Sequence, residues 1–187
     1  MKKVLIFTYS TEQGGSELNA FKILKLSSQT NFDWTVLNRS TSDLTSKIKN
    51  CDNLKNYRSL DFLGVKSTRI INCIVALIDI FKNGNYQTVY AVGFMPALLV
   101  SILKPFFSFR FISTRRERMP WAKYYHIPFI KFINFMSDYI ETNSKTIEIE
   151  LQNSIFTKGK VYLLPNFILR SINKKHDIFK NNKRYIG

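Results

Sequence analysis

The segment VLIFTYSTEQGGSELNAFKILKL, residues 4–26, decides the expected fold. It opens with a short run of apolar and β-branched residues, 4–8, which predicts a buried strand. A polar stretch with adjacent glycines follows, and residues 16–26 predict a helix with Leu18, Phe21 and Leu24, or the aliphatic stem of Lys25, facing inward. A strand, a glycine loop and a helix in this order form the first part of a βαβ unit.

The same alternation of short apolar runs and longer amphipathic stretches continues along the chain. It is typical of parallel strands that helices cover on both faces. The further strands are expected at residues 33–38, 57–63, 88–92, 110–114, 138–142 and 160–164, and the further helices at 42–50, 67–81, near Pro96, 123–136 and 144–152. The predicted fold class is therefore α/β, a Rossmann-like doubly wound parallel sheet.

Composition and charge limit the classes of partner. The 187 residues include 28 Lys and Arg against 13 Asp and Glu, a formal net charge of +15. Such an excess favours an anionic partner: a nucleic acid, a membrane surface or a phosphorylated substrate. The basic residues are scattered rather than held on one element, and no recognition helix or finger spacing is present, which disfavours nucleic acid.

Cysteine and histidine spacing gives no metal motif. Cys51, Cys73, His126 and His176 stand far apart in the sequence, so we expect no metal and a reducing, cytoplasmic compartment. The most membrane-like stretch, residues 89–103, is shorter than the about 20 residues that span a bilayer. We interpret it as a buried strand followed by a helix.

Ligands of parallel sheets bind at the carboxyl ends of the strands, so the loops there hold the candidate site residues. The first loop contains Gly14 and Gly15, which let a ligand approach the backbone, and Ser16 and Glu17, which open the next helix. The structural alternative is a tight turn with a favourable first helical turn. Because this loop follows the first strand, we favour the interpretation that it contacts a ligand.

The second loop follows the strand expected at 110–114. It carries Arg115, Arg116, Glu117 and Arg118, and arginine can clamp a phosphate or carboxylate with two parallel hydrogen bonds. A solvated charged loop is the alternative. The third group, Asn143, Ser144 and Asn166, also lies at strand ends, where such residues most often cap helices or form turns.

Three segments together resemble the N-terminal domain of glycosyltransferase family 4, which has the GT-B fold. They are GGSE at 14–17, SDYIETNS at 137–144 and LLPNFI at 163–168, and the resemblance extends to about residue 168. It implies a Rossmann-like N-terminal, acceptor-side domain over residues 1–169, followed at 170–187 by a basic linker and the start of a C-terminal donor-binding domain.

The resemblance also implies an activity, a retaining transferase of the hexosyltransferase type. A nucleotide sugar serves as cosubstrate, no cofactor or metal is held, and the acceptor is a surface glycan or lipid-linked saccharide, as in polysaccharide biosynthesis. Without the donor-binding domain and its Glu-x7-Glu carboxylates, the chain alone is expected to be inactive.

Site roles follow from the same resemblance. The donor diphosphate is expected to approach Gly14, Gly15 and Ser16. The candidates for catalysis are Arg115, Arg116 and Glu117. The acceptor cleft is expected to be lined by Glu17, Arg118, Asn143, Ser144 and Asn166. Two features depart from the family. Arg115 and Arg116 stand where many members have a histidine, and Phe167 replaces the glycine of the usual PNG.

The aromatic stretch 121–136 has two interpretations. With Lys123 and Lys131 it could form an amphipathic helix on anionic lipid, as a peripheral protein at the inner face of the membrane, or its aromatics could belong to the core. Two other functions remain open: a basic module that binds anionic surfaces or nucleic acid, and a nucleotide-dependent enzyme complete in one domain. The second would need a phosphate fingerprint or acid pair, which the sequence does not contain.

Overall fold

The chain folds around one parallel sheet. The structure, a computed structural model, describes residues 2–8, 15–26, 32–38, 54–59, 67–116, 123–157 and 159–165. The strands are β1 (Lys2–Thr8), β2 (Phe32–Asn38), β3 (Leu54–Ser59), β4 (Thr88–Val92), β5 (Arg110–Thr114), β6 (Tyr139–Thr142) and β7 (Val161–Leu163). Their order in the sheet is β3-β2-β1-β4-β5-β6-β7, and every pair is parallel. The predicted α/β class is confirmed.

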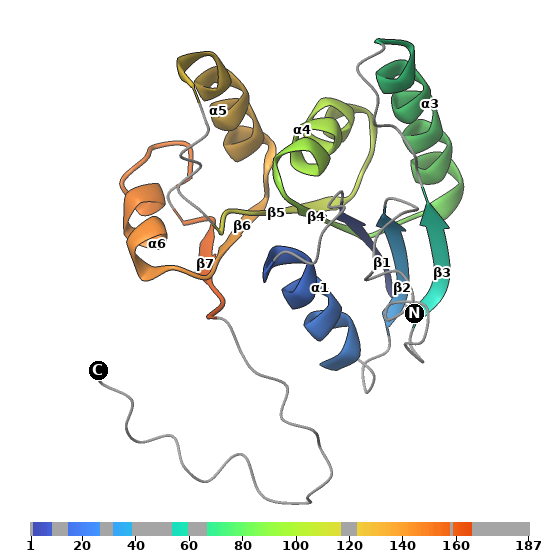
Figure 1. The fold of residues 1–187 in the computed structure, drawn as a ribbon, viewed down its shortest axis with the longest axis horizontal. Coiled ribbons are helices and arrows are strands. Elements are labelled where there is room, and N and C mark those ends of the chain that lie inside the picture. Colours follow the sequence, from blue (N-terminus) through green and yellow to red (C-terminus); the bar gives the residue numbers. More distant parts are fainter. Residues whose placement is uncertain are drawn as a thin grey trace, which may run out of the picture.

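Helices cover both faces of this sheet (Figure 1). They are α1 (Gly15–Leu26), α3 (Ser67–Gly84), α4 (Phe94–Leu103), α5 (Ile127–Met136) and α6 (Lys145–Gln152), with short 3-10 turns η2 (Lys104–Phe106) and η3 (Tyr124–His126). In Figure 1, α1 lies on one side of the sheet, and α3, α4 and α5 lie on the other. This arrangement is the doubly wound fold expected from the sequence.

The two-sided cover explains why the first strand is a continuous apolar run. Leu5 and Phe7 belong to the core cluster shared with α3, α4 and α5, whereas Val4 and Ile6 pack with α1. All four side chains are buried. Burying an aliphatic or aromatic side chain of this size contributes about 1.5–3 kcal/mol, which makes β1 and its neighbours the stable centre of the molecule.

Three details differ from the sequence expectations. The third strand begins at Leu54 rather than at the expected residue 57, because its pairing with β2 starts at Trp34 and Leu54, although this segment is largely polar; the expected end at 60–63 lies outside the described residues. On α1, Leu18 is exposed, and the buried row is formed by Ala20 and Leu24. The helix expected at 123–136 divides into η3 and α5. The helix expected at 42–50 lies outside the described residues.

Among the helices that the structure describes, none combines the length and the apolar character that crossing a membrane requires. The apolar stretch at 89–103 is the buried strand β4 followed by α4, as interpreted from the sequence.

Candidate functional site

The carboxyl edge of the sheet has its switch point between β1 and β4, because the chain proceeds outward from this pair in opposite directions. Thr8 and Val92 are paired at that edge. The next residue, Gly93, has a φ of 90°, which L side chains rarely adopt, and its N–H donates to Thr114 Oγ1 at 3.2 Å. The turn from β4 into α4 is thereby tied to the end of β5.

A buried polar cluster of Arg116, Tyr90 and Glu141 lies beneath this edge. Arg116 follows β5, and its Nη2 pairs with Glu141 Oε1 and donates to the Tyr90 hydroxyl at 3.2 Å. That hydroxyl donates to Glu141 Oε2, so both carboxylate oxygens accept a hydrogen bond. The Arg116 and Glu141 side chains are only 5% and 6% exposed. Three adjacent strands are therefore linked by one charged cluster.

Burial dominates the electrostatics of this cluster. It raises the pKa of Glu141, and the opposing effects of the Arg116 charge and of the hydrogen bonds from Tyr90 and Arg116 do not cancel that rise. Burial and the neighbouring Glu141 carboxylate also raise the pKa of Tyr90, despite the opposing Arg116 charge. Tyr90 therefore stays a protonated donor at neutral pH.

The Arg116 guanidinium has unused hydrogen-bonding capacity. Its Nε and Nη1 are buried and have no hydrogen-bond partner. A buried donor without a partner costs about 1–3 kcal/mol, so this arrangement is unfavourable unless another oxygen approaches. Thr8 Oγ1, which belongs to the residue at the end of β1, is also buried without a partner. The carboxyl edge thus holds polar groups that the described protein atoms leave unsatisfied.

Besides Arg116, six candidates from the sequence lie in the described part of the chain at or near this edge. The Arg115 N–H donates to Glu141 O at 2.7 Å, which continues the β5–β6 pairing. Asn143 and Ser144 follow β6, and Ser144 stands at the N-cap of α6 without a side-chain capping bond. Gly15, expected in the loop, is the first residue of α1.

The remaining candidates are placed less fully. Ser16 and Glu17 belong to the first turn of α1. Gly14, Glu117, Arg118 and Asn166 lie outside the described residues. Arg115 and Arg116 follow β5, and Asn143 and Ser144 follow β6, which is paired with β5, so the four residues share the carboxyl edge of the sheet.

Sequence reasoning missed Tyr90 and Glu141, the two partners of Arg116. Both lie inside strands, TVYAV and YIET; the first was interpreted only as core, and the second was used only for its resemblance to a family segment. The available signal was Glu141 itself. A carboxylate within a short buried strand is costly unless it is paired, and the nearby arginine loop supplied the obvious partner.

The amino edge of the sheet carries an open depression of about 1080 Å³. It lies among the starts of β1, β4, β5 and β6, and its basic residues are Lys2, Lys104 and Arg110. Lys104 is paired with Asp138 Oδ2 at 2.8 Å, and Arg110 lies over the Tyr139 ring at 5.7 Å. Most of this charge is therefore already engaged within the protein.

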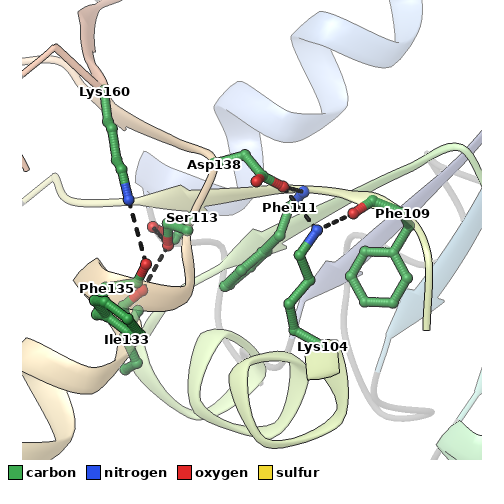
Figure 2. Close-up of polar contacts among 9 residues, drawn as sticks. Lys104, Phe109, Phe111, Ser113, Ile133, Phe135, Asp138 and Lys160 are labelled. Carbon is green, nitrogen blue, oxygen red and sulfur yellow. Dashed lines mark hydrogen bonds and ion pairs between the residues drawn. The ribbon is translucent and has the colours of Figure 1, made fainter. Parts of the chain in front are cut away.

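Figure 2 shows how the amino edge is closed around Lys104. Its ammonium lies between the carbonyl of Phe109 and the carboxylate of Asp138. The same carboxylate accepts the Phe111 N–H at 2.7 Å. Burial alone would raise the pKa of Asp138, but the hydrogen bonds from Lys104 and Phe111 and the Lys104 charge outweigh it and lower that pKa.

Within the described ranges, no group of three or more His, Cys, Asp or Glu residues is arranged to hold a metal ion. Cys73 is buried in the core with a free thiol, and burial raises its pKa to about 12. Such a thiol stays protonated and unreactive at neutral pH.

Comparison with solved structures finds the same architecture in proteins of low sequence identity. The chain is similar to HepE from Anabaena in complex with UDP and glucose, with a TM-score of 0.72, 10% identity, and coverage of 90% of this chain and 45% of that one. It is also similar to sucrose-phosphate synthase from Thermosynechococcus elongatus, with a TM-score of 0.67, 11% identity, and coverage of 88% and 48%.

A third similar structure is the UDP-GlcNAc 2-epimerase from Methanocaldococcus jannaschii, with a TM-score of 0.63, 13% identity, and coverage of 87% and 45%. No family model matches the sequence. No curated protein matches it either. The chain spans less than half the length of these three solved structures, and at such low identity the likeness establishes the fold, one Rossmann-like half of the GT-B type.

Proposed function

We propose that this chain is the acceptor-side half of a retaining glycosyltransferase that uses a nucleotide sugar and acts on a surface glycan or a lipid-linked saccharide. The support is twofold. The fold resembles one half of HepE bound to UDP and glucose and one half of sucrose-phosphate synthase. The GGSE, SDYIETNS and LLPNFI segments occur in the order expected for family 4.

The observation that carries the proposal is the buried Arg116 guanidinium at the carboxyl edge. Its Nη2 is fixed by Glu141 and Tyr90, whereas Nε and Nη1 have no partner. Nε and Nη1 belong to the rigid guanidinium fork, which matches two oxygens of a phosphate or carboxylate. A substrate oxyanion that reaches these atoms would remove the cost of leaving them unpaired.

The roles of the other candidates rest on the family resemblance. Gly14, Gly15 and Ser16 approach the donor diphosphate with backbone N–H groups, because a glycine loop before a helix permits close contact. Arg115 and Glu117 are further catalytic candidates beside Arg116. The acceptor cleft is lined by Glu17, Arg118, Asn143, Ser144 and Asn166.

Half of such a cleft gives little catalysis. Transfer requires the donor, its leaving diphosphate and the acceptor hydroxyl to be held together in a water-poor site, and such positioning accounts for about 7–11 kcal/mol of the barrier. On this chain alone, the nucleotide would face open solvent, where each hydrogen bond competes with water. We therefore propose that activity requires a C-terminal donor-binding domain.

The test compares the 187-residue chain with a form joined after Gly187 to a donor-binding Rossmann domain, taken from the coding sequence where one follows in frame. Both are incubated with a panel of nucleotide sugars and acceptors, and the nucleoside diphosphate and glycosylated product are quantified. We expect product only from the joined form. Robust transfer by the 187-residue chain, or none by the joined form with any acceptor, would contradict the proposal.

The epimerase likeness favours a second candidate, isomerisation of a nucleotide sugar. The two functions separate when acceptor is omitted. Without an acceptor, a transferase releases little nucleoside diphosphate. An epimerase needs no acceptor and still changes the configuration of the sugar. Chromatography of the nucleotide sugars after such an incubation decides between them.

A further inference from the structure

The outward side of α5 carries an exposed row of two apolar side chains and one lysine. Ile127, Lys131 and Phe135 recur every four residues and are all exposed, while Ile133 and Asn134 face the core. Just before the helix, Tyr124 is 84% exposed and contacts the ring of Tyr125 edge-on. Most of the aromatics on this side are therefore not core residues. The sequence left open whether the aromatic residues of 121–136 lie in the core or on the surface.

The turn after α6 extends the same surface. Phe156 contacts Phe135 edge-on, with ring centroids 6.4 Å apart, and the adjacent Ile155 is 92% exposed. We name this the α5 surface; its members are Lys123, Tyr124, Tyr125, Ile127, Lys131, Phe135, Ile155 and Phe156, all of them exposed. Large apolar side chains gathered on one side of a helix and a neighbouring turn mark an interaction site.

Charge selects the partner of the α5 surface. Residues 123–137 contain two lysines and no acidic residue. At the end of α5, Lys160 Nζ donates to Phe135 O at 3.2 Å and adds a third cation. Of the acids that follow, Asp138 is paired with Lys104 and Glu148 with Lys145, while Glu150 on α6 is exposed.

We propose that the α5 surface docks on an anionic lipid bilayer. Exposed aromatic and aliphatic side chains enter the headgroup region, and the flanking lysines contact the anionic headgroups. The exposed row on α3 differs, because Ile71 and Val75 share their helix with Asp79, and fewer apolar side chains gather there. Lipid fits better than nucleic acid, which would use the lysines and stack bases on the aromatic rings but gains little from the exposed aliphatic side chains of Ile127 and Ile155.

This docking is independent of sugar transfer, so it is tested on the 187-residue chain without substrates. Sedimentation with vesicles of phosphatidylglycerol and phosphatidylcholine is compared with phosphatidylcholine alone, at low and high salt. The variants are the apolar pair Phe135→Ser with Ile155→Ser and the basic pair Lys123→Gln with Lys131→Gln. Matched controls are Ile71→Ser with Val75→Ser, and Lys25→Gln with Lys82→Gln, all exposed positions elsewhere.

We expect binding to the anionic vesicles that weakens with salt, and little binding to the neutral ones. Both double variants of the α5 surface should bind the anionic vesicles more weakly, and the basic one should lose about fivefold in affinity for each lysine removed. The control variants should bind like the wild type. Circular dichroism and melting temperature report whether each variant folds. Equal binding to both vesicles, equal loss in the control pairs, or loss in the basic pair without loss in the apolar pair would overturn the proposal.

Discussion

Two ion pairs lie at opposite ends of the same strands, and they are built differently. At the carboxyl edge, Arg116 and Glu141 are almost fully buried, and the guanidinium keeps two donors without partners. At the amino edge, Lys104 and Asp138 are 20% and 42% exposed, and both charged groups have several partners (Figure 2).

The difference separates a structural link from a candidate binding site. Lys104 joins the end of α4 to the start of β6 and lies 5.1 Å from the Phe109 ring, so its contacts are complete without a ligand. The Arg116 guanidinium is buried, which is unfavourable for a charged group, and only its Nη2 has hydrogen-bond partners. Buried polar groups without partners are rare in proteins, and perturbed ionisable groups cluster at functional sites.

Replacement of Arg116 by Met should have the largest effect. In the complete enzyme we expect transfer to fall about 100-fold or more, as when a preorganised donor to a developing charge is lost. Folding should weaken by about 3–5 kcal/mol, because Glu141 is left buried without its cation. Urea unfolding of the chain measures the second effect, and Arg116→Lys is the matched variant that keeps the charge without the fork. Full activity in either variant would remove Arg116 from the proposed site.

Glu141→Gln should destabilise the chain almost as strongly. It leaves the Arg116 charge buried without an anion, which costs about 3–5 kcal/mol, and the amide oxygen recovers part of this as an acceptor. Tyr90→Phe, which removes one hydroxyl from the same cluster, should cost only about 1–2 kcal/mol. Urea denaturation compares the two; an equal loss in both would indicate that hydrogen bonding rather than charge holds the cluster.

Lys104→Met tests the amino edge and should have a smaller effect. The pair it breaks is partly solvated, so we expect a loss of about 1 kcal/mol or less in unfolding free energy. Transfer by the complete enzyme should not change. A loss of activity comparable to that of Arg116→Met would show that the amino edge, with its open depression, is the functional one.

The pH dependence of stability should have opposite signs at the two pairs. The pKa of Glu141 is raised, so its stabilising contribution is present below the unfolded pKa and is lost as pH rises through the folded one. The pKa of Asp138 is lowered, so its contribution is present above the unfolded pKa and is lost as pH falls through the folded one.

Unfolding free energies of Glu141→Gln and Asp138→Asn, measured across acidic to neutral pH, check these slopes. In the wild type, Glu141 makes the unfolding free energy fall as pH rises, and Glu141→Gln should lack this contribution. Asp138 makes the unfolding free energy rise with pH, and Asp138→Asn should lack that contribution. The Asp138 effect should be well under about 1 kcal/mol, because that carboxylate is substantially exposed. Slopes of the same sign in both variants would contradict the opposite directions of the two pKa shifts.

Sequence patterns were most informative where strands are buried on both faces. The runs at residues 4–8 and 88–92 have few alternatives to core strands, and a loop after such a strand locates Arg115 and Arg116 at the ligand edge. The pattern placed the start of the third strand at 57 instead of 54, because a polar strand gives no period of two and its register depends on β2. Glu141 was missed although a carboxylate in a buried strand was a signal, and its second partner, Tyr90, comes from β4, which no local pattern brings near it.

The aromatic stretch shows a similar limit. Periodicity at 123–136 was compatible with both a core helix and a surface helix, since apolar residues surround most of it. The structure leaves Tyr124, Ile127 and Phe135 exposed because neither the sheet nor a described neighbouring helix covers that side of α5. Tertiary packing, which local sequence does not encode, decided between the two.

Hydrogen–deuterium exchange of the complete enzyme, with and without nucleotide sugar and acceptor, tests the central claim most directly. The claim is that substrates bind at the carboxyl edge and complete the Arg116 cluster. We predict slower exchange on ligand binding in peptides that contain Gly93, Arg115, Arg116 and Ser144, and no change in peptides that contain Gln87, Lys104 and Asp138. Protection confined to the amino-edge peptides would contradict the account.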